Sequence, residues 1–211
     1  MEWGRRIILA LASLVQGSYH WLSDEKRGRT SNRSSPAEVL LVLGGSETRE
    51  LACAALHSGE ALLVLSSGAA TPEECAAAAG IDLRRVVVDR RAVCTVTNFT
   101  SIVTDLEKAG CRSVVISTSP SHMRRAFLVG CVCLGSRGIR CERRCCRDDD
   151  DPEGPRQEST LRVLRDLLRS ALWLLAGWDG GGVAGWWYPY RGRAAREAKG
   201  LDLGAALQAR R

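Results

Sequence analysis

The chain has 211 residues, of which 45% are hydrophobic and 26% are charged, and its formal net charge at pH 7 is +6. These values are ordinary for a globular protein and leave room for one domain with a sizeable core plus terminal segments. The positive charge comes from scattered arginines without interleaved aromatic residues, so we expect no nucleic-acid partner. An anionic small molecule, an acidic membrane surface or simple solubility would explain this charge balance equally well.

The first 36 residues carry two competing signals. Two arginines precede an apolar run at residues 7–15, which resembles the charged and hydrophobic regions of a signal peptide but is short for a bilayer span. A basic, serine-rich segment at residues 26–35 follows, as in an organelle transit segment or a linker. We therefore assign residues 1–36 as a targeting, anchor or linker segment. The alternative is a first amphipathic helix that packs on the domain.

From residue 39 onward, short apolar runs alternate with segments of helical character. Continuous apolar runs are typical of strands buried on both faces of a parallel sheet. One helix start is especially clear, because Thr71 offers an N-cap, Pro72 suits the first helical position and two glutamates follow. The expected strands are 39–43, 62–65, 85–88, 113–116 and a weaker one from 138; the expected helices are 47–57, 72–80, 95–110, 121–134 and 161–175.

This alternation predicts a three-layer, Rossmann-like α/β domain with a mainly parallel sheet over residues 37–178, followed by a Gly/Trp/Arg-rich flexible tail at 179–211. Right-handed crossovers place the carboxyl ends of the strands along one edge, where open sheets bind ligands. We therefore expect one crevice, lined by the residues that follow the strands: Gly44, Gly45, Ser67, Gly68, Asp89, Thr118 and Ser119.

The stretch from Ser117 to Ala126 is the strongest functional signal. A strand ends there in small hydroxyl residues, and a helix with His122, Arg124 and Arg125 begins. Backbone N–H groups at a helix N-terminus, together with arginines, are a common anion site. An imidazole also exchanges a proton near neutral pH, so His122 is a candidate general acid or base.

The nine cysteines indicate neither a metal site nor a disulfide framework. Cys53, Cys75, Cys94 and Cys111 are isolated among apolar or small residues and are typical of buried thiols. The five cysteines between 131 and 146 match no zinc spacing and have no histidine nearby. We expect a reducing compartment, cytoplasm or plastid. Since no basic partner for Cys94 is evident, we do not expect it to act as a nucleophile.

Taken together, these motifs resemble the YdcF/SanA/ElyC-like family, whose biochemical role is poorly defined. The resemblance runs from residue 39 to about 138, and the phrase at 95–99 with Gly177-Trp178 looks like the branch of the family from photosynthetic lineages. Thr97 stands where the family usually has glutamate. The segments that carry the resemblance are Leu43–Gly45 with Arg49, Ser67-Gly68, Asp89, Thr95–Asn98 and Ser119–Ala126.

The resemblance implies a set of polar site residues. Arg49 and Arg125 would grip a phosphate or carboxylate, His122 would act as acid or base, and Asp89 would orient a water or a metal. Glycines would let backbone amides approach the ligand. Three structural alternatives stay open: an ion pair of Arg49 with Asp89, an N-cap role for Thr95, and a bond from His122 to a backbone carbonyl. The recurrent polar positions are Arg49, Asp89, Thr95, Asn98, His122 and Arg125.

Two functions follow as expectations. The first is an enzyme that acts on an anionic substrate, for which the resemblance implies phosphorylated or lipid-linked envelope or glycan intermediates. The second is a non-catalytic domain that binds S-adenosylmethionine or a nucleotide. Contact with a membrane surface is a third expectation, through the N-terminal segment or through the tail, where Trp186, Trp187 and Tyr188 precede two arginines.

Overall fold

A computed structural model describes residues 2–27, 38–59, 61–66, 69–146 and 158–181, together with Leu203 and Leu207; within 18–27 it describes the backbone only. The expected site residues Ser67 and Gly68, and the aromatic cluster at 186–188, lie outside the described residues.

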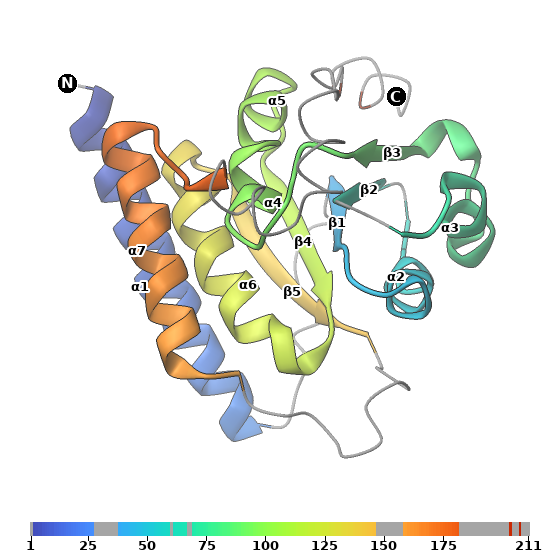
Figure 1. The fold of residues 1–211 in the computed structure, drawn as a ribbon, viewed down its shortest axis with the longest axis horizontal. Helices are drawn as coiled ribbons and strands as arrows, with labels where there is room; N and C mark the ends of the chain where they lie inside the picture. The colour runs from blue at the N-terminus through green and yellow to red at the C-terminus, as the bar shows by residue number, and fades with distance from the viewer. Residues whose placement is uncertain are drawn as a thin grey trace.

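A five-stranded, all-parallel sheet forms the centre of the domain (Figure 1). The strand order β3-β2-β1-β4-β5 confirms the predicted Rossmann-like α/β fold. The order reverses between β1 and β4, which are direct neighbours, so the topological switch point lies between their carboxyl ends. The strands are β1 (Val39–Leu43), β2 (Leu62–Ser66), β3 (Val86–Asp89), β4 (Ser113–Thr118) and β5 (Arg140–Cys145).

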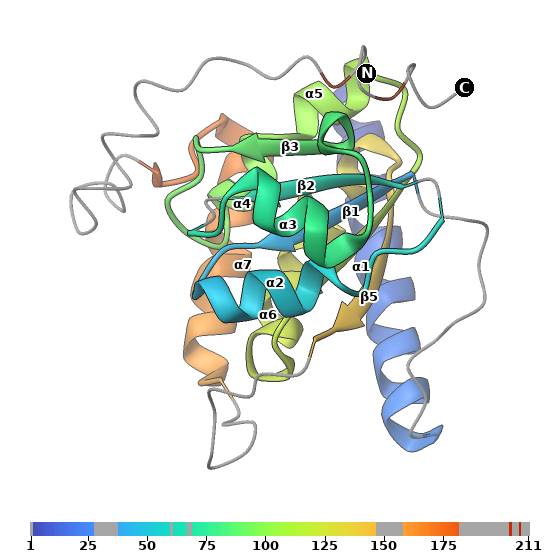
Figure 2. The same ribbon diagram turned by 90° about the vertical axis from the view of Figure 1, so that its right-hand side faces the viewer.

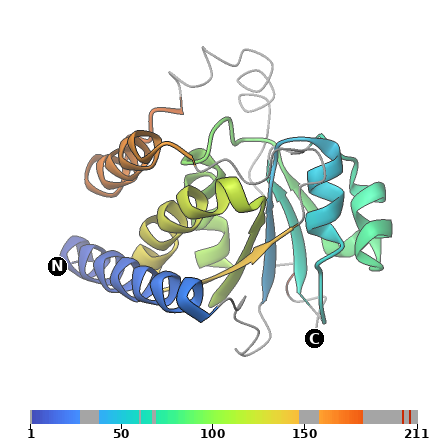
Figure 3. The same ribbon diagram turned by 90° about the horizontal axis from the view of Figure 1, so that it is seen from below.

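Helices cover both faces of the sheet (Figure 3). Alternate residues of the strands point to opposite faces, so Leu41 and Ile116 join one core and Leu40 and Val115 join the other. The first core packs against α4, α5 and α6, and the second against α2 and α3. The helices are α1 (Glu2–Arg27), α2 (Glu47–Ala54), α3 (Pro72–Ala79), α4 (Thr97–Thr100), α5 (Val103–Lys108), α6 (Pro120–Cys133) and α7 (Thr160–Ala176), with 3₁₀ turns η1 (Leu83–Arg85) and η2 (Gly135–Arg137).

The predicted start of α3 is confirmed. Thr71 caps the helix through Glu74 in a capping box, and Gly80 ends it in the left-handed conformation. The single helix expected at 95–110 is instead two short helices, α4 and α5, with a break at Ser101 and Ile102. At the break the N–H of Ile102 donates to the carbonyl of Phe99 at 3.3 Å, three residues back, in place of the regular bond four residues back.

Helix α1 is docked on the domain, as in the alternative of an amphipathic first helix. Ala10 and Gly17 are buried in the packed face. A Cβ atom on Gly17 would lie 2.7 Å from Sγ of Cys131 in α6, so only glycine allows this close approach. Among the described residues, no helix combines the length and the apolarity that a transmembrane span requires.

The chain beyond residue 178 contacts the domain where it is described. Oγ1 of Thr100 donates a hydrogen bond to the carboxylate of Asp179 at 2.6 Å. Leu203 is fully buried in the core that contains α6. At these positions the segment expected as a flexible tail therefore packs against the folded domain.

Candidate functional site

The loop that follows β1 is held by internal hydrogen bonds. The N–H of Gly44 donates to the carbonyl of Ser66 at 2.8 Å, and the N–H of Gly45 donates to Oε1 of Glu50 at 2.9 Å. Both amides are therefore occupied within the protein. The expectation that the Gly44 and Gly45 amides approach a ligand is not met.

Glu50 is a fully buried carboxylate that the sequence analysis missed. Its Oε2 accepts the N–H groups of Ala69 and Ala70 at 2.7 and 2.8 Å, while Oε1 accepts that of Gly45. It thereby joins the loop after β1 to the loop after β2. An acidic residue in the first turn of a helix that follows a Gly-Gly loop is the signal that could have identified it. Buried backbone donors need such partners.

Arg49 lies across Gly45. A Cβ atom on Gly45 would come within 1.1 Å of an Arg49 guanidinium nitrogen, so a larger residue there would displace the arginine. Nη2 of Arg49 donates to the carbonyl of Gly44 at 3.2 Å, whereas Nε is buried and has no partner within the described ranges of the chain. The alternative of an Arg49–Asp89 ion pair is not what the structure has, because Asp89 pairs with Arg91.

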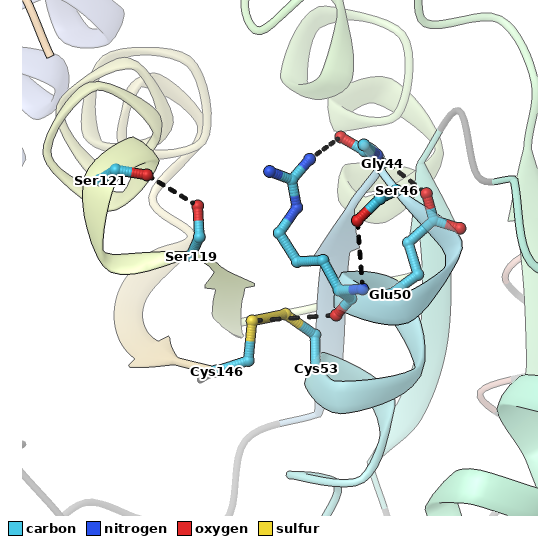
Figure 4. The surroundings of a disulfide bond; sticks show 9 residues. Gly44, Ser46, Glu50, Cys53, Ser119, Ser121 and Cys146 are labelled. Atoms are coloured by element: carbon cyan, nitrogen blue, oxygen red, sulfur yellow. Dashed lines mark hydrogen bonds between the residues drawn. A yellow bond between two sulfur atoms is a disulfide. The ribbon is translucent and has the colours of Figure 1, made fainter. Parts of the chain in front are cut away.

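The carboxyl end of β4 supplies three fully buried hydroxyl residues, Ser117, Thr118 and Ser119. The hydroxyls of Ser117 and Thr118 have no hydrogen-bond partner among the residues that the structure describes, and that of Ser119 lies 3.2 Å from the hydroxyl of Ser121. Figure 4 shows Ser119 and Ser121 at the start of α6, across from Gly44 on the other side of the switch point. Loops from β1 and β4 thus face each other where the topology predicts a ligand.

Asp89 is held in a structural network. Its carboxylate accepts bonds from Nε of Arg91 at 2.8 Å and from Oγ of Ser101 at 2.8 Å. Burial alone lowers the pKa of Arg91, but its bonds to Asp89 and Asp105 raise that pKa above its usual value. No bond joins Asp89 to His122 in the described part of the chain. Both carboxylate oxygens already have partners, which leaves little support for a role in orienting water.

Residues 93–98 form a tight turn before α4. Oγ1 of Thr97 accepts the N–H groups of Val93 and Cys94, both at 2.8 Å. Asn98 accepts a bond from Oγ of Ser66 at 3.1 Å, which ties α4 to the end of β2. The turn is thus held by Thr97 rather than by the expected cap Thr95, which is itself buried.

His122 and Arg125 contact residues at the start of α7. Nε of Arg125 donates to Glu158 at 2.8 Å and Nη1 donates to Asp166 at 2.8 Å. Nδ1 of His122 lies 3.4 Å from Glu158 and 2.9 Å from Arg125. Glu158 and Asp166 were not expected from the sequence, although Asp166 is the single acid of α7.

The charges in this cluster are mutually stabilised. Burial alone raises the pKa of Glu158, but hydrogen bonds from His122 and Arg125 lower it to about 2. Burial likewise opposes ionisation of Asp166, whereas bonds from Arg165 and Arg125 hold its pKa below the usual value. The ion pairs of Arg125 therefore connect α6 to α7 and to Glu158 just before it. An anionic ligand could bind Arg125 only by displacing two carboxylates from it.

A disulfide bond joins Cys53 of α2 to Cys146, the residue after β5 (Figure 4). Cys53 is therefore not the free buried thiol that the sequence predicts. Disulfides are typical of oxidising compartments, so this bond gives no support to the expected reducing compartment, which stays a prediction. The other seven cysteines are free.

Cys94 has a basic neighbour that the sequence did not reveal. Nη2 of Arg169, on α7, donates to its Sγ at 3.2 Å, and Thr97 donates to the same sulfur at 3.4 Å. Within the described part of the chain, no three histidine, cysteine or acidic residues are grouped so as to hold a metal.

No family model matches this chain, and searches of curated proteins and of solved structures find no match either. The resemblance to the YdcF/SanA/ElyC-like family therefore stays a prediction.

Proposed function

We propose that this chain binds a small molecule through a phosphate or similar oxyanion, at the switch point between β1 and β4. The observation that carries the proposal is a set of buried polar groups for which the described residues offer no hydrogen-bond partner: Nε of Arg49 and the hydroxyls of Ser117 and Thr118. Such groups are rare in folded proteins, because each one has lost its hydrogen bonds to water without gaining others.

An oxyanion suits these groups chemically. The guanidinium is a pure donor, and a hydroxyl can also donate, whereas a phosphate or carboxylate oxygen is a strong acceptor. The N-terminus of α6, a helix of 14 residues, adds a favourable partial charge. The hydroxyls of Ser119 and Ser121 lie at this same terminus and extend the donor set.

An enzymatic role on phosphorylated or lipid-linked intermediates rests on the family resemblance and on His122. The same holds for the S-adenosylmethionine or nucleotide alternative, which rests on the Rossmann-like topology. Both remain compatible with an oxyanion subsite. Binding of a charged group is accordingly the function to test first.

Isothermal titration with inorganic phosphate, adenosine monophosphate and S-adenosylmethionine tests this proposal. We expect binding of the two phosphates, and we expect Arg49→Gln to weaken it about tenfold or more, because a hydrogen bond to a charged group contributes about 1.5–3 kcal/mol. Arg84→Gln is the matched control, since the Arg84 side chain is 89% exposed on η1. Absence of phosphate binding, or equal affinity of Arg49→Gln and the wild type, would overturn the proposal. Tight binding of S-adenosylmethionine alone would favour the alternative ligand.

A further inference from the structure

Helix α7 exposes a continuous stripe of leucines. Its packed face carries Val163, Asp166 and Ser170, which are buried against the domain. On an ideal helix of 3.6 residues per turn, the leucines fall on the opposite side, away from that packed face. They are between 45% and 76% exposed: Leu161, Leu164, Leu168, Leu172 and Leu175.

Helix α1 repeats this arrangement. Its packed face contacts α6 and η2, whereas Ile8, Leu11 and Val15 on its other side are 56–69% exposed. The side chains of Ile8, Leu11, Ala12, Val15 and Gln16 line a shallow, almost entirely apolar surface there. Large exposed apolar patches mark interaction surfaces.

The two helices that carry the stripes lie on one side of the molecule. Helices α1 and α7 flank α6 on the same face of the sheet and run in opposite directions (Figures 1 and 3), and Figure 2 shows them on either side of α6. The N-terminus of α1 and the carboxyl end of α7 therefore lie at the same end of the domain. Trp3 and Trp178, each about half exposed, belong to these two ends.

Among the side chains that the structure describes on α1 and α7, the exposed charges are all positive: Arg5, Arg162 and Arg165. The one acid among these described side chains, Asp166 of α7, is buried and paired with Arg125. Two such faces from two copies of the chain would repel one another, so the charge pattern disfavours a homodimer and favours an anionic partner.

We propose that the outward faces of α1 and α7 bind an anionic membrane surface. Leucines and isoleucine would enter the boundary between headgroups and acyl chains, while arginines would contact acidic headgroups. Tryptophans at the ends of both helices suit the interfacial region. Each helix would lie along the surface and not cross it. This inference does not depend on the oxyanion site.

Co-sedimentation of the full chain with vesicles tests the inference. We expect binding to vesicles of equal parts phosphatidylcholine and phosphatidylserine, and little binding to phosphatidylcholine alone. Leu164→Gln and Leu168→Gln should each weaken binding about tenfold or more. Arg5→Gln and Arg162→Gln should each weaken it about fivefold. Because these residues are exposed, we expect the folded state and phosphate binding to be unaffected.

Leu83→Gln is the matched control, since Leu83 is an exposed leucine on η1, far along the chain from both helices, and we expect no change in vesicle binding. Failure to bind either vesicle, or equal binding of the leucine variants and the wild type, would overturn the inference. So would a concentration-dependent dimer, seen by analytical ultracentrifugation, that the leucine variants abolish. That result would assign the face to a second copy of the chain.

Discussion

Replacing Thr118 with valine should stabilise the ligand-free protein and weaken its binding of phosphate. The Thr118 hydroxyl is fully buried and has no partner in the part of the chain that the structure describes, and valine has nearly the same shape. A buried polar group without a hydrogen bond costs about 1–3 kcal/mol. We therefore expect Thr118→Val to raise the free energy of unfolding by about 1 kcal/mol, after allowing for imperfect repacking.

Ser66→Ala is the matched control for this prediction. Ser66 is also fully buried at the carboxyl edge of the sheet, but its hydroxyl donates to Asn98 at 3.1 Å. Its removal should lower the free energy of unfolding by about 1–2 kcal/mol, because the Asn98 oxygen loses its partner. The two substitutions each remove one hydroxyl at the same edge of the sheet, yet they should change the free energy of unfolding in opposite directions.

Urea denaturation with and without inorganic phosphate measures both effects. Phosphate should raise the unfolding midpoint of the wild type by mass action, and should raise that of Thr118→Val less. A loss of stability in Thr118→Val equal to that in Ser66→Ala would refute the reasoning, since it would mean that the Thr118 hydroxyl already has a partner in the ligand-free protein.

Three further predictions concern groups that hold the site. Reduction of the Cys53–Cys146 bond, which spans 93 residues, should lower the free energy of unfolding by up to about 4.6 kcal/mol in urea; a Cys53→Ser variant should be insensitive to reductant, and an insensitive wild type would count against the bond. Glu50→Gln should lower the free energy of unfolding by about 3 kcal/mol, because three N–H groups lose a charged acceptor and the glutamine NH2 group can accept none of them, whereas Glu47→Gln, an exposed change in the same turn, should not. Glu158 has a pKa lowered from 4.5 to about 2, so its stabilising contribution is complete above pH 4.5 and is lost as the pH falls towards 2. Urea titrations across this range should show Glu158→Gln and the wild type converging at acid pH, and a constant gap would contradict the assignment.

The sheet was predictable because its strands are continuous apolar runs, such as 39–43, bounded by glycine or small polar residues. The switch point at which we place the proposed site could be predicted from topology alone. Long-range pairings were not predictable from spacing: Cys53 and Cys146 have Cα atoms 4.9 Å apart although 93 residues separate them. The break between α4 and α5 was also missed, because no proline or glycine marks it in the sequence at residues 95–109.

The recurrent polar positions that carry the family resemblance differ in whether their side chains are already hydrogen-bonded within the protein. Asp89, Asn98 and Arg125 use their side chains for internal bonds that join one element to another. A residue that completes a buried network is needed for folding whatever the ligand, because a partner left behind would be unsatisfied. Arg49 differs, since one of its buried donors has no partner. Of these four positions, Arg49 is therefore the one whose replacement should change binding more than stability, and comparing Arg49→Gln with Arg125→Gln in both assays separates the two roles.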